Sequence, residues 1–213
     1  MIVEDGWVDR IMTWLRALSA LIVVNFLIIA GTLAGAVVLG ALPALAAGSV
    51  CLTQLRDGDG SGIVRRFAAE YRARFWRANA LGAPFVLVGA LLVADTLVLP
   101  ALPQAAATAL AVFTWVAGAY TAISLVAALA IDVRYRDRIA PTLRFAVGLS
   151  LASPLMALVL AGSLAVIIAS LLALPMFIPL LGLSIPLFVG GWFVDHRLAQ
   201  LDAHHPRAAA LAR

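Results

Sequence analysis

The chain has 213 residues, of which 64% are hydrophobic and 12% are charged, and its formal net charge is +4. A soluble domain is about half apolar and about a quarter charged, so the composition excludes an ordinary soluble domain and predicts an integral membrane protein. All basic residues are arginine and gather in a few clusters. This pattern favours an anionic lipid surface as their partner and argues against nucleic acid.

Two long stretches, 17–55 and 145–194, contain no Asp, Glu, Lys, Arg or His. About 20 apolar residues suffice for one helical crossing, so each stretch predicts about two crossings. A mixed-charge head, 1–16, leads into a first span at 17–40. Pro43 predicts a helix restart, because proline is tolerated in a first turn. The following segment, 43–55, is short and is either a full crossing or a re-entrant helix.

The segment 57–62 predicts a polar turn, because it alternates aspartate or serine with glycine. It resembles the first half of a calcium loop, with Asp57, Asp59 and Ser61 at ligand positions and Gly62 at the sharp turn. The position that should supply a bidentate glutamate is Ala68. We therefore expect a polar loop that holds no ion.

Residues 63–77 form the strongest amphipathic pattern in the chain. Apolar residues recur at three- and four-residue spacing, as in a helix with one apolar face: Val64, Phe67, Ala68, Tyr71 and Phe75. Most other positions are basic: Arg65, Arg66, Arg72, Arg74 and Arg77. Such a helix either lies at the lipid headgroups and packs internally or offers a basic, aromatic face to a cytoplasmic partner.

Four further spans are predicted, at 79–99, 105–131, 145–171 and 175–194, with a second basic segment at 132–144 and a polar tail at 195–213. The second basic segment contributes Arg134, Arg136 and Arg138 as further candidates for partner or lipid contact. The turns near 100–104 and 171–175 contain no arginine. Because arginine-rich short loops mark the cytoplasmic side, the head, 56–78, 132–144 and the tail are expected there.

The sequence thus predicts an all-α, polytopic membrane helical bundle with about six membrane helices, the second one short or re-entrant, plus an amphipathic interfacial helix. We expect it to form a single membrane domain, 1–213, with both termini in the cytoplasm.

Few polar groups lie inside the predicted spans. Asp95 lies near a span end, where it can face water or headgroups, and Asn25 lies deep in the first span, where an interhelical hydrogen bond is its expected use. Proton relays need several ionisable groups within the spans. We find no nucleophile, metal or phosphate motif, and we expect no catalytic residue, no metal site and no cofactor.

Several segments carry a family resemblance. They are the head ending Trp14-Leu-Arg16, the span with Asn25, the restart at Pro43, the aromatic and basic segment from Phe67 to Asn79, and the span ending just past Asp95. Together they resemble the YesL-like family of bacterial membrane proteins, a domain of unknown function. The resemblance implies a small protein of about six helices, often encoded beside carbohydrate ABC importers and their regulators. Pro43, Asn79 and Asp95 match its more distinctive positions.

We therefore expect a non-enzymatic accessory membrane protein, whose partners are the lipid bilayer and subunits of a carbohydrate ABC importer. The alternative is a small stand-alone transporter or channel with Asn25, Asp95, Trp115 and Tyr120 along its path. A third hypothesis is a lipid-binding role for the basic segments.

Overall fold

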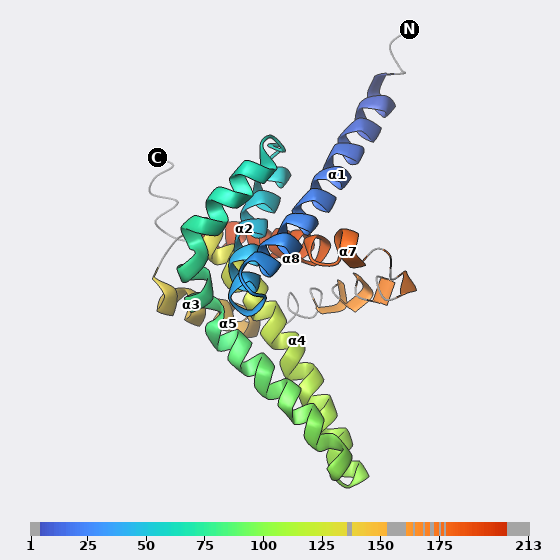
Figure 1. The fold of residues 1–213 in the computed structure, drawn as a ribbon, viewed down its shortest axis with the longest axis vertical. Coiled ribbons are helices and arrows are strands. Elements are labelled where there is room, and N and C mark those ends of the chain that lie inside the picture. Colours follow the sequence, from blue (N-terminus) through green and yellow to red (C-terminus); the bar gives the residue numbers. More distant parts are fainter. Residues whose placement is uncertain are drawn as a thin grey trace. The chain divides into compact units, whose positions relative to one another are not determined.

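The computed structural model describes residues 5–135, 138–152, 161–163, 165–167, 169–170, 173–174, 176 and 178–203. Within these ranges the chain is helical and contains no strand, which confirms the predicted all-helical class. The elements are α1 (Asp5–Ala34), α2 (Val38–Arg56), α3 (Ile63–Val98), the 3-10 turn η1 (Leu99–Ala101), α4 (Gln104–Tyr135), α5 (Ile139–Ala152), α7 (Ile178–Leu181) and α8 (Ser184–Ala203) (Figure 1).

Four of the described helices contain stretches long and apolar enough to cross a membrane. These are Trp14–Ala34, Val38–Arg56, Ile63–Ala101 and Gln104–Tyr135. They are compatible with a multi-pass membrane protein. Parts of the predicted fifth span, 145–171, lie outside the described residues, namely 153–160, 164, 168 and 171, so the count of about six helices stays a prediction.

The chain divides into two compact units. The first comprises Met1–Ala78 and Ala165–Val189, and the second comprises Asn79–Leu164 and Gly190–Arg213. Helices α3 and α8 each contribute residues to both units.

In the first unit, α1 and α2 form a tight antiparallel hairpin. Its turn places Ala36 and Val37 in the left-handed region, at φ values of 56° and 63°, which is uncommon for residues other than glycine. Glycine makes room between the two helices, because a β-carbon on Gly48 of α2 would lie 2.7 Å from Cδ1 of Ile28 on α1. Small residues therefore let the two helix backbones approach closely.

This hairpin corrects two boundaries predicted from the sequence. The first apolar helix ends at Ala34 and not at residue 40, and α2 begins at Val38, five residues before Pro43. Pro43 is buried inside α2, in its second turn, where its missing N–H removes one bond from the helical ladder. With 19 residues, α2 is close to the roughly 20 that a crossing needs.

The structure also corrects the prediction of a separate interfacial helix at 63–77. Residues 63–98 form one continuous α3 of 36 residues, about 54 Å long at about 1.5 Å per residue. Pro84 lies inside it. The basic amphipathic segment is therefore the first half of a long helix whose second half is apolar.

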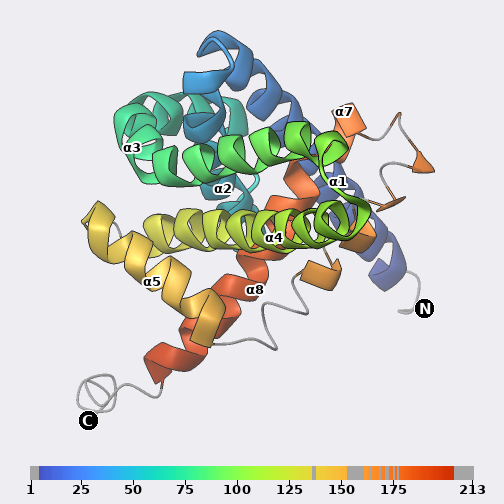
Figure 2. The same cartoon turned by 90° about the horizontal axis from the view of Figure 1, so that it is seen from below.

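The second unit is built around the second half of α3, the long α4, α5 and the end of α8. The latter half of α3 and the first half of α4 run side by side in opposite directions in both views (Figure 2). A hydrophobic core joins the four helices, with members Leu81, Phe85, Ala127, Ile131, Ala146, Leu149, Val194 and Leu198. The Tyr120 hydroxyl donates to the carbonyl oxygen of Val147 at 2.9 Å and so ties α4 to α5.

Candidate functional site

The first half of α3 has one face that packs on the α1–α2 hairpin. Phe67 and Ala78 are buried on this face, and the Tyr71 hydroxyl donates to the carbonyl oxygen of Gly31 at 2.9 Å. A β-carbon on Gly31 would lie 3.3 Å from the Phe67 ring and 3.2 Å from Cβ of Ala44. Three helices of the first unit therefore meet at Gly31, and the rotation of α3 about its axis is set there.

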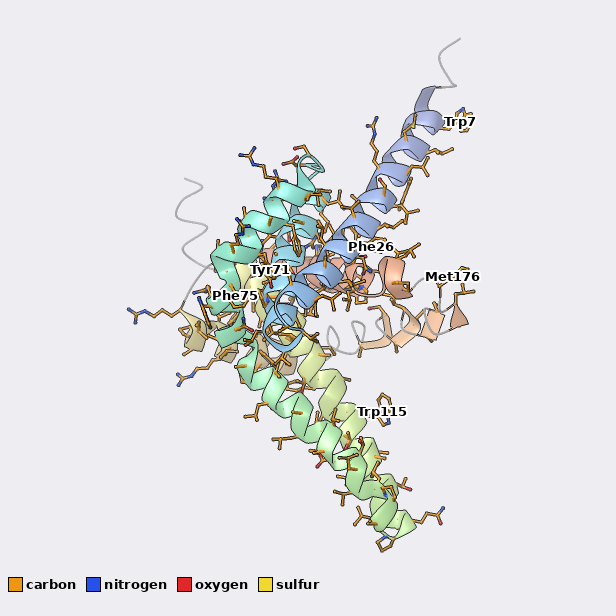
Figure 3. All side chains as sticks on the ribbon, viewed as in Figure 1. Trp7, Phe26, Tyr71, Phe75, Trp115 and Met176 are labelled. Carbon is orange, nitrogen blue, oxygen red and sulfur yellow. The ribbon has the colours of Figure 1, made fainter. Side chains whose placement is uncertain are left out.

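Aromatic side chains follow one another along this half of α3 (Figure 3). The ring centroids of Phe67 and Tyr71 are 6.1 Å apart, and those of Tyr71 and Phe75 are 5.7 Å apart. Phe75 and Trp76 meet edge to face at 5.3 Å. Such contacts stiffen the helix surface beyond what burial alone provides.

Arg74 differs from the exposed contact residue that the sequence pattern suggested. It is 6% exposed, and its Nε donates to Oε2 of Glu70 at 2.6 Å, one helical turn away. The sequence pattern predicted Arg74 on the polar face of the helix. In the structure Arg74 lies on the packed face, where its charge is paired with that of Glu70. Arg74 is therefore paired within its own helix and, being buried, offers little surface to a partner.

The opposite face of the same half of α3 is exposed. The residues on it recur at four, three and four positions, which is one helix face, and we call this set the α3 stripe: Arg65, Ala69, Arg72 and Trp76. The Trp76 side chain is 77% exposed. Sequence reasoning noted the arginines but did not single out Trp76, although an isolated tryptophan among arginines could have marked it.

The turn before α3 is organised by Asp59. Its Oδ1 accepts hydrogen bonds from the hydroxyl and the backbone N–H of Ser61 at 2.7 and 3.1 Å, and its Oδ2 pairs with Arg66 at 2.8 Å. The hydroxyl of Ser61, then its N–H, then Arg66 lower the pKa of Asp59 to about 2. Gly58 and Gly62 have positive φ. Both carboxylate oxygens of Asp59 thus make contacts within the turn and the first turns of α3.

The second basic segment is only partly described. Arg134 lies in the last turn of α4, with its guanidinium carbon 5.5 Å from the ring centre of Tyr135. Arg138 is exposed, and Arg136 lies outside the described residues. Arg77, the remaining basic candidate of the first segment, is half-buried on α3.

Asn25 makes three hydrogen bonds to a distant part of the first unit. It is fully buried and lies near the middle of the apolar stretch of α1. Its Nδ2 donates to the carbonyl oxygen of Pro179 at 2.7 Å, and its Oδ1 accepts from the N–H groups of Leu183 and Ser184 at 2.8 and 3.0 Å. The expectation of a hydrogen bond from α1 to a distant helix is confirmed.

These partners reveal a break in the predicted last span, 175–194. Helix α7 ends at Leu181 and α8 begins at Ser184, so this segment is not one continuous helix. Asn25 supplies the acceptor that the first N–H groups of α8 lack. The sequence Gly182-Leu-Ser184-Ile-Pro186 carries the signal for this break, because glycine favours helix ends, serine favours helix starts and proline favours first turns.

The other polar candidates of the predicted spans belong to the second unit. Asp95 is half-buried on the last turn of α3. Trp115 is 80% exposed and points away from α4 into open space (Figure 3). Tyr120 is engaged with Val147. The exposed position of Trp115 therefore does not fit a side chain that lines a transport path.

Metal ligands, a thiol and a family-like position are the remaining candidates for chemistry. Among the described residues, no three His, Cys, Asp or Glu side chains are placed to hold a metal ion. Cys51 is buried in α2. Asn79, one of the family-like positions, is half-buried on α3 where the two units join. The described part of the chain thus presents packing contacts and basic surfaces.

The described part of the chain is all-helical, and its long apolar helices are compatible with a multi-pass membrane protein. Residues 21–96, from the second half of α1 to the end of α3, match the family model described as "Protein of unknown function, DUF624". This segment contains Asn25, the α1–α2 hairpin and the α3 stripe. No match was found among curated proteins or among solved structures.

Proposed function

We propose that this chain is a non-enzymatic accessory protein of the bacterial cytoplasmic membrane that associates with a carbohydrate ABC importer or with its regulation. The helices long enough to cross a bilayer support a membrane location. The distribution of arginines supports a cytoplasmic position for the head, both basic segments and the tail. The link to importers rests on the resemblance to YesL-like proteins alone, since the matching family model is described as of unknown function.

The observation that carries this proposal is the α3 stripe. The opposite face of its helix is attached to α1 by the hydrogen bond from Tyr71 to Gly31, so Arg65, Arg72 and Trp76 face outward on a supported helix. Tryptophan and arginine are the residue types most enriched among residues that dominate binding energy at interfaces. A rigid helix face loses little conformational entropy when it binds a partner.

The stripe fits an acidic groove on a cytoplasmic subunit or loop. Two arginines separated by two helical turns provide charge attraction and orientation, and Trp76 provides a large apolar anchor between aqueous and lipid surroundings. The alanine between them, Ala69, lets a partner backbone approach the helix.

Co-purification tests the proposal. The tagged full-length chain, extracted in mild detergent from its own host, should carry importer subunits with it, and Arg65→Glu or Arg72→Glu should reduce their yield about tenfold or more. Arg144→Glu is the charge-matched control, because Arg144 is exposed on α5 and lies off the stripe. Full recovery of importer subunits with both stripe variants would refute the contact surface.

The alternative, a stand-alone transporter or channel, has one observation in its favour. A helix break near the middle of the membrane, satisfied by a polar side chain, is a feature of substrate sites in transporters, and Asn25 satisfies such a break. Solute uptake by the purified protein in liposomes, abolished by Asn25→Leu, would establish this alternative in place of the accessory role.

A further inference from the structure

The first unit contains a groove that neither basic segment explains. It has a volume of about 630 Å³, within the range of about 300 to 1,000 Å³ typical of small-molecule sites. Three elements line it: the start of the α1 span, the end of α2 with the following turn, and the start of α3. The lining residues are Arg16, Ala17, Ser19, Ala20, Val23, Leu55, Gly58, Gly60 and Ile63.

The groove has a polar end and an apolar wall. Ala17, Ala20 and Val23 follow one another at three-residue spacing along α1, inside the apolar stretch Trp14–Ala34, and Leu55 and Ile63 complete the wall. Arg16 lies at the end of the groove nearest the head. A ligand that fills this groove must therefore carry an anionic group and a hydrocarbon chain in one molecule.

The charge of the lining favours an anion. Among the lining residues Arg16 alone is charged, and the turn beside the groove carries two aspartates, Asp57 and Asp59. Asp59 turns both carboxylate oxygens toward Ser61 and Arg66, and Arg56 lies over the Phe188 ring. The remaining carboxylate, Asp57, is exposed in the turn. The turn itself meets the groove with glycine backbone, at Gly58 and Gly60.

Ser19 is the other polar side chain of the lining, and its hydroxyl has a partner within the helix. Its hydroxyl donates to the carbonyl oxygen of Arg16 at 2.9 Å, so the hydroxyl is occupied and the guanidinium is the main donor at the polar end. A guanidinium binds phosphate oxygens in a bidentate manner, with hydrogen bonds stronger than those between neutral groups. The geometry suits a phosphodiester headgroup on Arg16 with an acyl chain along Ala17, Ala20 and Val23.

We propose that this groove binds one anionic phospholipid, of the phosphatidylglycerol type, from the leaflet that contains the polar ends of α1 and α2. The site is independent of the importer contact, since none of its lining residues belongs to the α3 stripe. A free phosphate would leave the apolar wall uncovered, and a lipid without net charge would leave Arg16 without a net counter-charge.

Native mass spectrometry of the full chain in detergent tests this site. With phosphatidylglycerol and phosphatidylcholine of equal chain length supplied together, the wild-type protein should retain one phosphatidylglycerol about tenfold more often than phosphatidylcholine. Arg16→Gln should lower that retention about tenfold, the loss expected for a charge-assisted hydrogen bond. Ala17→Phe, which fills the groove, should lower it similarly.

The matched controls are Arg65→Gln and Leu18→Phe, since Arg65 and Leu18 are exposed and do not line the groove. Both should retain the lipid as the wild-type protein does. Circular dichroism melting of each variant shows whether it folds, and Arg16→Gln alters an exposed side chain. Equal retention of both lipids, wild-type retention in both groove variants, binding of inorganic phosphate in place of lipid, or occupancy by a second copy of the chain would each overturn the proposal.

Discussion

The hydroxyl of Tyr71 donates a hydrogen bond to the carbonyl oxygen of Gly31, 2.9 Å away, and so joins the basic half of α3 to the end of α1. Tyr71 lies on the packed face of α3, with Phe67 and Arg74 beside it. Arg72 and Trp76 consequently lie on the opposite face. One contact inside the first unit thus determines which arginines are presented outward.

Removing this hydrogen bond should loosen α3 without exposing new charge. We expect Tyr71→Phe to lower the free energy of unfolding by about 1 kcal/mol, the usual net value of one hydrogen bond. Reversible unfolding in mixed micelles, followed by circular dichroism, measures this change. Trp76→Phe serves as the control, because its side chain is 77% exposed. Equal stability of Tyr71→Phe and the wild type would contradict the role assigned to this bond.

Replacing Asn25 should have a larger effect. Asn25→Leu leaves the N–H groups of Leu183 and Ser184 without their acceptor in an apolar environment, which should cost on the order of 3 kcal/mol. The same unfolding assay measures it, and protease cleavage between α7 and α8 should increase.

Thr114→Val is the matched control for Asn25. The Thr114 hydroxyl is buried without a hydrogen-bond partner among the described residues, so its removal should leave stability unchanged or slightly higher. A loss as large as that of Asn25→Leu would show that hydrogen bonding does not explain the Asn25 effect.

The helix hairpin should not tolerate a side chain at Gly40. A β-carbon there would lie 2.7 Å from the carbonyl oxygen of Gly31, so Gly40→Ala forces α1 and α2 apart and should cost about 1 to 3 kcal/mol. Gly89→Ala is the control, because a β-carbon at Gly89 meets nothing within 4 Å. That variant should match or exceed wild-type stability, since alanine favours helix more than glycine does. Equal melting temperatures for the two variants would contradict the close approach of the helices.

The contacts that the Asp59 carboxylate makes in the turn before α3 should be lost only in strong acid, when the carboxylate is protonated. The folded pKa of Asp59 is lowered to about 2 from an ordinary value of 3.8. A lowered folded pKa contributes stability above the unfolded pKa, and this is lost as pH falls through the folded value. The window is therefore about pH 4 to 2.

Carboxyl carbon NMR of Asp59 measures its midpoint directly. Ser61→Ala should raise the midpoint more than Arg66→Gln does, because the Ser61 hydroxyl is the largest cause of the lowering. A wild-type midpoint near 4, or the reverse order of the two variants, would contradict the turn geometry.

The sequence predicted the helical class and the polar turn, because both depend on local patterns. Charge-free stretches indicate membrane helices, and alternating glycine and aspartate indicates a turn. The start of α2 was wrong, because the turn before it is made by Ala36 and Val37 in left-handed conformations. Neither residue type indicates such a turn, whereas proline is common at helix starts, so the start was predicted at Pro43.

Features that depend on contacts distant in the chain were not predictable in the same way. The charge of Arg74 placed it on the polar face, although its pairing with Glu70 at four residues could be read from the sequence. The role of Asn25 depends on Pro179 and Ser184, more than 150 residues away. The groove at Arg16 requires α1, α2 and α3 to be packed together, which no local pattern encodes.

The central claim is that the α3 stripe contacts an importer subunit. Photocrosslinking in living cells tests it most directly, with benzoylphenylalanine placed at Trp76 or at Trp115. Both side chains are highly exposed, at 77% and 80%, so they are matched in accessibility. We expect a crosslink from position 76 to a carbohydrate importer subunit, which Arg72→Glu should abolish, and no such crosslink from position 115. An absence of importer crosslinks from position 76, or equal crosslinking from both positions, would contradict it.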